Sequence, residues 1–156
     1  YIWAKNCQEK FDVVIIDFPD PSNYSLGKLY SLNFYATIQK LLNQDAVVVI
    51  QTTSPYFAPK SFWCINKTVM QVFPQIDAYH AYVPSFGEWG FTIAINGFGT
   101  TFNTVNRKVD ALRFYNYQFD KFNYFSQDMI SKDIEINRLD NQILVRYFDE
   151  EWGKLQ

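Results

Sequence analysis

The sequence predicts an α/β fold in which parallel strands are followed by an antiparallel pair. Two apolar runs, Val13–Ile16 and Ala46–Ile50, lack strict alternation and therefore resemble parallel strands that are covered on both faces. A stretch with apolar residues at helical spacing separates these runs, and two strand-like segments joined by a short turn come later. The 156 residues have the length of one domain, so we expect residues 1–156 to form a single domain.

Two helices are expected in the first half of the chain. The first covers residues 31–42, between the two apolar runs, and Ser31 is a suitable N-cap for it. The second covers residues 59–73, because proline is tolerated in a first helical turn and Pro74 would end the helix. The first apolar run, the first helix and the second apolar run together form a βαβ unit.

The later segments predict strands and then a looser extension. Residues 76–85 and 89–97 are strand-like, and the short turn between them favours an antiparallel pair at the edge of the sheet. Residues 1–105 would therefore hold the sheet, its helices and the active-site loop, and residues 106–156 a C-terminal extension. Within the extension we expect an aromatic-rich helix over residues 109–125, then a loop and a terminal strand within residues 136–152.

Charge and cysteine content exclude some classes of function. A net charge of −2 argues against a nucleic-acid partner, because phosphate binding needs a basic face. Cys7 and Cys64 fit neither a metal spacing nor a disulfide framework, and we interpret both as reduced intracellular thiols. The apolar runs are too short to cross a membrane. Since the chain begins at Tyr1 and almost at once enters a core strand, we expect it to be the interior of a longer protein.

Two carboxylates stand where the first strand ends. Asp17 follows the strand directly, and Asp20 is held between Pro19 and Pro21. In sheets of this kind, ligands bind beyond the carboxyl ends of the parallel strands, and Gln51 ends the next strand along the chain. From these residues alone a solvated Asp-Pro turn is the commoner explanation, so a binding site and a simple turn both stay open.

Four segments in order resemble the spermidine synthases, the polyamine aminopropyltransferases. They are IIDFPDPSNYSLGKLYSLNFY, VVVIQTTSPYFAPKSFW, YHAYVPSFGEWGFTIA and INRLDNQILVRYFDEEW. The last is similar to the tail of a bacterial branch in which an integral-membrane region precedes the enzyme. The resemblance implies that the chain is the C-terminal half of a methyltransferase-like Rossmann sheet. It also implies transfer of an aminopropyl group from decarboxylated S-adenosylmethionine to putrescine or a related amine, giving spermidine and methylthioadenosine.

The chemistry of that reaction assigns different roles to the two carboxylates. An alkylamine resembles lysine, whose pKa is roughly 10, so the acceptor must bind as a cation and then lose a proton before it attacks. The resemblance implies that Asp17 is the general base and that Asp20 holds and orients the amine. Pro19 and Pro21 restrict the turn, so both acids would be in place before the substrate arrives.

Five further residues are matched to the site by the same resemblance. Gln51 is expected near the polyamine, although it could equally be a polar strand end. Phe86 stands where many relatives carry tyrosine, so it can contact methylene groups but offers no hydroxyl. Pro21, Leu29 and Tyr30 are expected to border the nucleoside of the donor.

Other polar residues are interpreted as structural. His80, the single histidine, is expected to be hydrogen-bonded within a strand, since one histidine does not make a metal site. Glu88 is interpreted as a solvated turn residue, with contact to the distal ammonium of the amine as the alternative. The polar cluster Asn137, Arg138, Asp140 and Asn141 is interpreted as a structural turn, with a docking function as the alternative.

The resemblance also implies a set of partners. Decarboxylated S-adenosylmethionine would be the co-substrate, with no prosthetic group and no metal, and the other ligand would be a small polyamine. The domain would lie in the cytoplasm, attached in relatives to an inner-membrane region. No glycine-rich nucleotide loop precedes Asp17, so we expect these 156 residues to be inactive alone. A homodimer or further chain would cover the open edge of the sheet.

Two other functions stay open at this point. A methyltransferase could share the fold, although the double-acid turn and the segment VPSFGEWGF argue against it. A non-catalytic polyamine-binding or interaction module is the second alternative, because Phe86 departs from the pattern of the relatives and the nucleotide half is missing.

Overall fold

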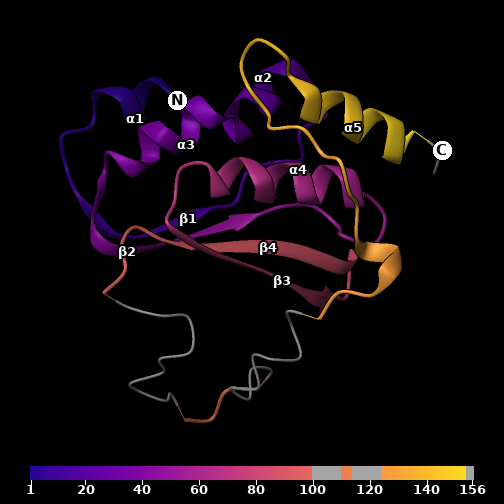
Figure 1. Ribbon diagram of the computed structural model, residues 1–156. Coiled ribbons are helices and arrows are strands. Elements are labelled where there is room, and N and C mark those ends of the chain that lie inside the picture. The colour runs from indigo at the N-terminus through magenta and orange to yellow at the C-terminus, as the bar shows by residue number, and fades with distance from the viewer. Residues whose placement is uncertain (100–109, 114–123, 154–156) are drawn as a thin grey trace.

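The computed structural model describes residues 1–99, 110–113 and 124–153 (Figure 1). Its elements, in chain order, are α1 (Ile2–Asn6), β1 (Phe11–Ile16), α2 (Tyr24–Gly27), the 3-10 turn η1 (Lys28–Tyr30), α3 (Leu32–Gln39), β2 (Leu42–Gln51), α4 (Pro59–Met70), β3 (Gln75–Val83), β4 (Gly87–Ile95), the 3-10 turn η3 (Gln127–Met129) and α5 (Ile143–Trp152). Across these described ranges, every helix falls short of the length and hydropathy that a membrane span requires.

The four strands form one mixed sheet in the order β1-β2-β4-β3. β1 pairs with β2 in parallel, and β4 is antiparallel to both of its neighbours. This arrangement confirms the predicted parallel strands followed by an antiparallel pair. Ile16 stands opposite Ile50 in the parallel register, so Asp17 and Gln51 leave the sheet side by side at its carboxyl edge.

The described helices cover one face of the sheet (Figure 1). Side chains alternate between the two faces of a strand, so neighbours in β1 differ sharply in exposure. Ile16 is 3% exposed on the helical face, whereas Val13 and Ile15 are 60% and 74% exposed on the other. We expected the apolar runs to be covered on both faces, and in the described residues only one face is.

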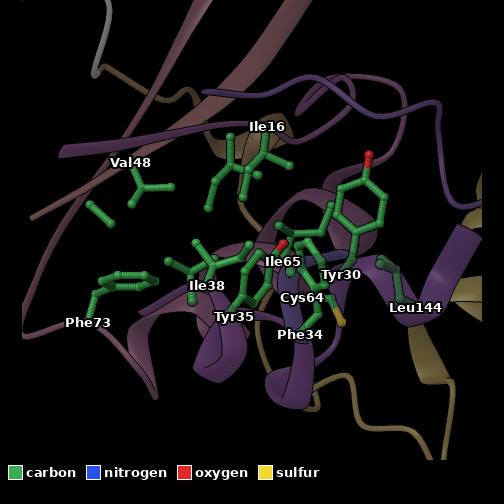
Figure 2. Packing of buried hydrophobic residues seen from close by; sticks show 14 of the residues in the cluster. Ile16, Tyr30, Phe34, Tyr35, Ile38, Val48, Cys64, Ile65, Phe73 and Leu144 are labelled. Atoms are coloured by element: carbon green, nitrogen blue, oxygen red, sulfur yellow. The ribbon is translucent and has the colours of Figure 1, made fainter. Parts of the chain in front are cut away.

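The core lies between the sheet and helices α3 and α4 (Figure 2). The Ser31 hydroxyl accepts a hydrogen bond from the Phe34 backbone N–H at 3.3 Å, which confirms Ser31 as the N-cap of α3. Pro59 opens α4 as predicted, although the helix ends at Met70, before Phe73. Cys64 is fully buried in α4, and burial raises the pKa of its thiol to about 12, so it packs as a small apolar side chain.

The last described residues form a helix where a strand was expected. Residues 143–152 form helix α5, so the expected terminal strand is wrong. The run ILVRYF is rich in β-branched and aromatic residues, but its buried and partly buried positions recur every three to four residues, as in a helix. The helix predicted over residues 109–125 falls largely outside the described residues, and residues 110–113 and 124–125 are not helical.

Helix α5 caps the N-terminus of α4 through Glu151. The N-cap residue of α4, Ala58, has no side chain able to accept a hydrogen bond. The Glu151 carboxylate accepts hydrogen bonds from the backbone N–H groups of Lys60 and Ser61 at 2.6 and 3.0 Å, and from the Ser61 hydroxyl at 2.7 Å. A negative charge is favourable at a helix N-terminus, so this long-range contact replaces a local cap.

Candidate active site

The acidic turn begins where β1 ends. Asp17 is exposed, Asp20 is half-buried and Pro21 is buried. Phe18 anchors the turn to the core, because its ring packs edge-on against Phe34 at 5.7 Å between ring centroids. The turn therefore presents one open carboxylate and one that is partly withdrawn from water.

Gln51 joins the end of β2 to this turn. Its side-chain Nε2 donates to the Phe18 carbonyl and to Asp20 Oδ1, both at 3.2 Å. Its Oε1 accepts from the Thr53 backbone N–H at 2.6 Å, which fixes the orientation of the amide. Gln51 is thus more than a polar strand end, since it holds the Asp20 carboxylate. Its contact with a polyamine stays a prediction.

The environment of Asp20 disfavours its negative charge. Burial raises the pKa of the Asp20 carboxyl, and the hydrogen bond from Gln51 and the nearby Thr53 side chain oppose that shift. The negative charge of a carboxylate held in this way is stabilised strongly when a cation comes close to it. This is the property expected of a group that binds an ammonium ion.

Tyr30 holds the turn from the side of the core. Its hydroxyl donates to the carbonyls of Phe18 and Pro19, both at 3.1 Å, and its side chain is fully buried. The pKa of the phenol is raised, first by burial and then by the charges of Asp20 and Asp17, so it remains a donor. The sequence predicted Tyr30 only beside the nucleoside of the donor, because nothing in a tyrosine's local sequence shows where its hydroxyl points.

A hollow of about 300 Å³ opens beside Asp17. It brings together three of the predicted site residues, Asp17, Gln51 and Phe86, whereas Asp20 is joined to it through Gln51. Pro21 and Leu29 do not line it. Most of its wall is apolar, which suits a methylene chain with a charged end. The full lining is Ile15, Ile16, Asp17, Val49, Gln51, Val83, Phe86, Trp89 and Phe91.

The loop after β2 is tied closely to β4. Thr53 has φ 64°, a left-handed conformation that is strained for a β-branched residue. The Gly90 N–H donates to the Thr53 carbonyl at 2.8 Å, and a Cβ at Gly90 would lie 2.4 Å from the Phe62 ring and 2.7 Å from that carbonyl. Only glycine allows the backbone of β4 to come this close to the Thr53 carbonyl. The resulting hydrogen bond fixes the loop whose Thr53 N–H orients the Gln51 side chain.

His80 and Glu88 form a pair outside the hollow. His80 Nδ1 lies 2.7 Å from Glu88 Oε2, and His80 Nε2 lies 2.7 Å from the Tyr124 carbonyl. The expectation of a hydrogen-bonded histidine within a strand is confirmed, and its structural role stays a prediction. Glu88, expected to be a solvated turn residue, is instead the partner of His80 across the β3–β4 hairpin.

Comparison with known protein families gives one matching family. The family model described as spermine/spermidine synthase domain matches residues 1–108. A polyamine aminopropyltransferase of Leptospira interrogans is 45% identical over 99% of this chain, and polyamine aminopropyltransferase 2 of Ralstonia nicotianae is 46% identical over 96%. The chain spans 31% and 29% of the length of these two relatives.

Comparison with solved structures confirms the fold. A spermidine synthase from Thermotoga maritima matches with a TM-score of 0.54 and 20% identity, over 98% of this chain and 47% of that one. A spermidine synthase in complex with the transition-state analogue AdoDATO matches with a TM-score of 0.56 and 22% identity, over 98% of this chain and 48% of that one. The mixed sheet with its parallel pair is thus the methyltransferase-like sheet expected from the sequence.

Proposed function

This chain belongs to the spermine/spermidine synthase domain family, and we propose that it forms the acceptor-amine side of an aminopropyl transfer site. The amine nitrogen of putrescine or a related amine attacks the carbon next to the sulfonium of decarboxylated S-adenosylmethionine. The new C–N bond forms as the C–S bond breaks, and methylthioadenosine leaves as a neutral thioether. The proton lost from the nitrogen passes to a base in the site.

The pairing of Asp17 and Asp20 at one strand end carries this proposal. Asp20 is half-buried and held by Gln51, so its role is to bind and orient the incoming ammonium. Asp17 is exposed and lines the hollow, and no described residue donates a hydrogen bond to its carboxylate, which leaves it free to take the proton. Two carboxylates thus divide binding and proton transfer between them.

The apolar wall of the hollow supports a polyamine acceptor. The rings of Phe86 and Trp89, whose centroids lie 5.1 Å apart, line it together with Val49. Burial of the methylene groups of a diamine against such a wall removes apolar surface from water, which favours binding. Since Phe86 has no hydroxyl, the far amine of the acceptor must find its hydrogen-bond partner elsewhere.

The donor side is proposed for a different part of the turn. Pro21 and Leu29 do not line the amine hollow, and we assign them to the nucleoside of decarboxylated S-adenosylmethionine, which serves as co-substrate without a metal. Residues 1–105 would form the catalytic part and residues 106–156 its extension. A cytoplasmic location, attachment to a membrane region and a homodimer stay predictions of the family resemblance.

An aminopropyl transfer assay on the complete gene product tests the proposed function. Purified protein is incubated with decarboxylated S-adenosylmethionine and a panel of amines, and release of methylthioadenosine is measured. Release that depends on the amine is the expected result, and the panel identifies the acceptor. A folded protein that binds the nucleotide but releases nothing with any amine would contradict the proposal and favour a binding module or a methyltransferase.

The variant Asp20→Asn is expected to bind amine more weakly and yet to be more stable at neutral pH. Loss of one charge-assisted hydrogen bond, about 1.5–3 kcal/mol, corresponds to a KM for the amine raised about 10- to 100-fold. Asparagine can still accept the hydrogen bond from Gln51.

The stability change follows from the direction of the pKa shift. Because the folded-state pKa of Asp20 is raised above its ordinary value of 3.8, this group lowers stability as the pH rises from about 4 through that raised pKa. Urea unfolding of both proteins between pH 4 and pH 8 measures the difference, which should grow in favour of the variant with rising pH. A variant that is less stable at pH 7 and has an unchanged KM would contradict both parts.

A further inference from the structure

A single buried side chain in the C-terminal extension clamps the turn that follows the acidic loop. Asn137 is fully buried, and its Nδ2 donates to the Gly27 carbonyl at 2.9 Å. Its own backbone carbonyl accepts from the Leu32 N–H at 2.9 Å. Gly27 and Leu32 stand on either side of η1, so Asn137 restrains this short turn at both ends.

Asn137 is itself fixed by two helices. Its backbone N–H donates to the Thr68 hydroxyl in α4 at 2.9 Å, and its Oδ1 accepts from the Leu144 N–H in α5 at 3.3 Å. The packing beside it is equally close, since a Cβ at Gly27 would lie 2.5 Å from Cγ2 of Val145. The extension is therefore locked onto α2 and η1 and has little freedom to shift there.

The clamped turn carries Tyr30, whose hydroxyl reaches the acidic loop. The carbonyls that it binds, those of Phe18 and Pro19, lie between the two carboxylates in the sequence. Asn137 therefore restrains η1 at both ends by hydrogen bonds, the covalent chain of η1 carries Tyr30, and the Tyr30 hydroxyl binds the backbone between Asp17 and Asp20. Proton transfer needs a base within about 3 Å of the nitrogen, so a small movement of this loop would matter.

We propose that Tyr30 and Asn137 are positioning residues, through which the C-terminal extension holds the two acids in their reactive arrangement. The inference rests on the proposed function and adds to it a role for residues that do not line the amine hollow. The extension then serves the reaction without touching the substrate.

The chain offers a matched control for Tyr30. Tyr35 is equally buried in the same core, but its hydroxyl has no hydrogen-bond partner among the described residues. Figure 2 shows the difference, with the Tyr30 oxygen pointing out of the cluster and the Tyr35 oxygen pointing into it. Tyr30→Phe and Tyr35→Phe each remove one buried hydroxyl, but only the first removes a contact with the acidic loop.

The experiment compares Tyr30→Phe, Tyr35→Phe and Asn137→Asp in the complete gene product. Aspartate keeps the shape of Asn137 but cannot donate to the Gly27 carbonyl. For Tyr30→Phe and Asn137→Asp we expect kcat to fall about 10-fold or more, a changed pH dependence of kcat, and faster hydrogen exchange of the backbone amides that residues 18–22 possess, those of Phe18, Asp20 and Ser22. For Tyr35→Phe we expect all three to stay within about twofold of the wild type. Exchange in α4 serves as the check that each variant is folded.

Two results would overturn the proposal. One is wild-type kcat and wild-type exchange of residues 18–22 in Tyr30→Phe, and the other is an equal loss in Tyr35→Phe. If Tyr30→Phe fails to fold, Asn137→Asp decides by the same readouts. Hydrogen exchange does not depend on the reaction, so absence of aminopropyl transfer in the wild type would refute the proposed function, while the exchange data would still decide whether Tyr30 and Asn137 hold the loop.

Discussion

Replacement of Asp17 by asparagine is expected to lower kcat for aminopropyl transfer by about 10²- to 10⁴-fold while the fold stays intact. The side chain is exposed at the end of β1 and forms no hydrogen bond or ion pair with a described residue, so its loss should not disturb the core. Without the carboxylate, the bound amine has no base to take its proton, and a protonated amine does not attack. Release of methylthioadenosine by the complete gene product measures the change.

A control on the same strand distinguishes loss of the base from a general change of charge. Asp12 is also exposed in β1, and its Oδ1 accepts a hydrogen bond from Asn43 at 2.8 Å that asparagine could keep. Asp12→Asn should therefore retain the wild-type rate.

The pH dependence of the Asp17→Asn defect adds a second test. The fraction of neutral amine in solution rises toward pH 10, so the defect should shrink as the pH increases. A defect that is equally large at pH 7 and pH 9.5 would argue against the role of Asp17 as a base.

Replacement of Glu151 by alanine is expected to lower the free energy of unfolding by about 3 kcal/mol. Two backbone N–H groups and the hydroxyl of Ser61 would lose their charged acceptor in a buried place, and each unsatisfied buried group costs about 1–3 kcal/mol before water or local movement compensates. Urea unfolding measures the loss, and faster hydrogen exchange in the first turn of α4 locates it.

The neighbouring residue supplies the control for Glu151. Glu150 forms an exposed salt bridge with Lys60 at 3.1 Å, with 54% of its side chain accessible. Exposed pairs contribute about 0–1 kcal/mol, so Glu150→Ala should change stability little. Equal, small losses in the two variants would show that the helix cap formed by Glu151 is not important for the fold.

Much of the fold was predictable because it depends on local patterns. The apolar runs of β1 and β2, the N-cap Ser31 and the helix start at Pro59 each produce their structure through neighbouring residues, and all of them are confirmed. The terminal strand was wrong for the opposite reason. The composition of a short run such as ILVRYF is typical of a strand. The run forms a helix because that conformation packs its buried face on neighbouring elements.

For the candidate site, too, the local features were predictable and the long-range contacts were not. The two carboxylates, the stiff prolines between and beside them, and the glutamine at the next strand end could be found in the sequence, because strand ends and Asp-Pro turns are local signals. The hydrogen-bond partners that hold the turn could not be found in this way. The bond from Gln51 to Asp20 joins residues 31 positions apart, and the hydroxyl of Tyr30 reaches back 12 positions to Phe18.

By itself, the sequence determined the α/β class, the order of the four strands and of the two long helices α3 and α4, and the acidic turn at the end of β1, whereas the short elements α1, α2 and η1 were not predicted. Only the tertiary structure decided how that turn is held. Gln51 and Tyr30 bind its backbone directly. Asn137 acts on it indirectly, by a hydrogen bond to Gly27, which lies 110 positions earlier in the chain. The physical reason is that helices and strands follow from periodicity among near neighbours. A buried side-chain hydrogen bond instead depends on which distant segments the packed core brings together.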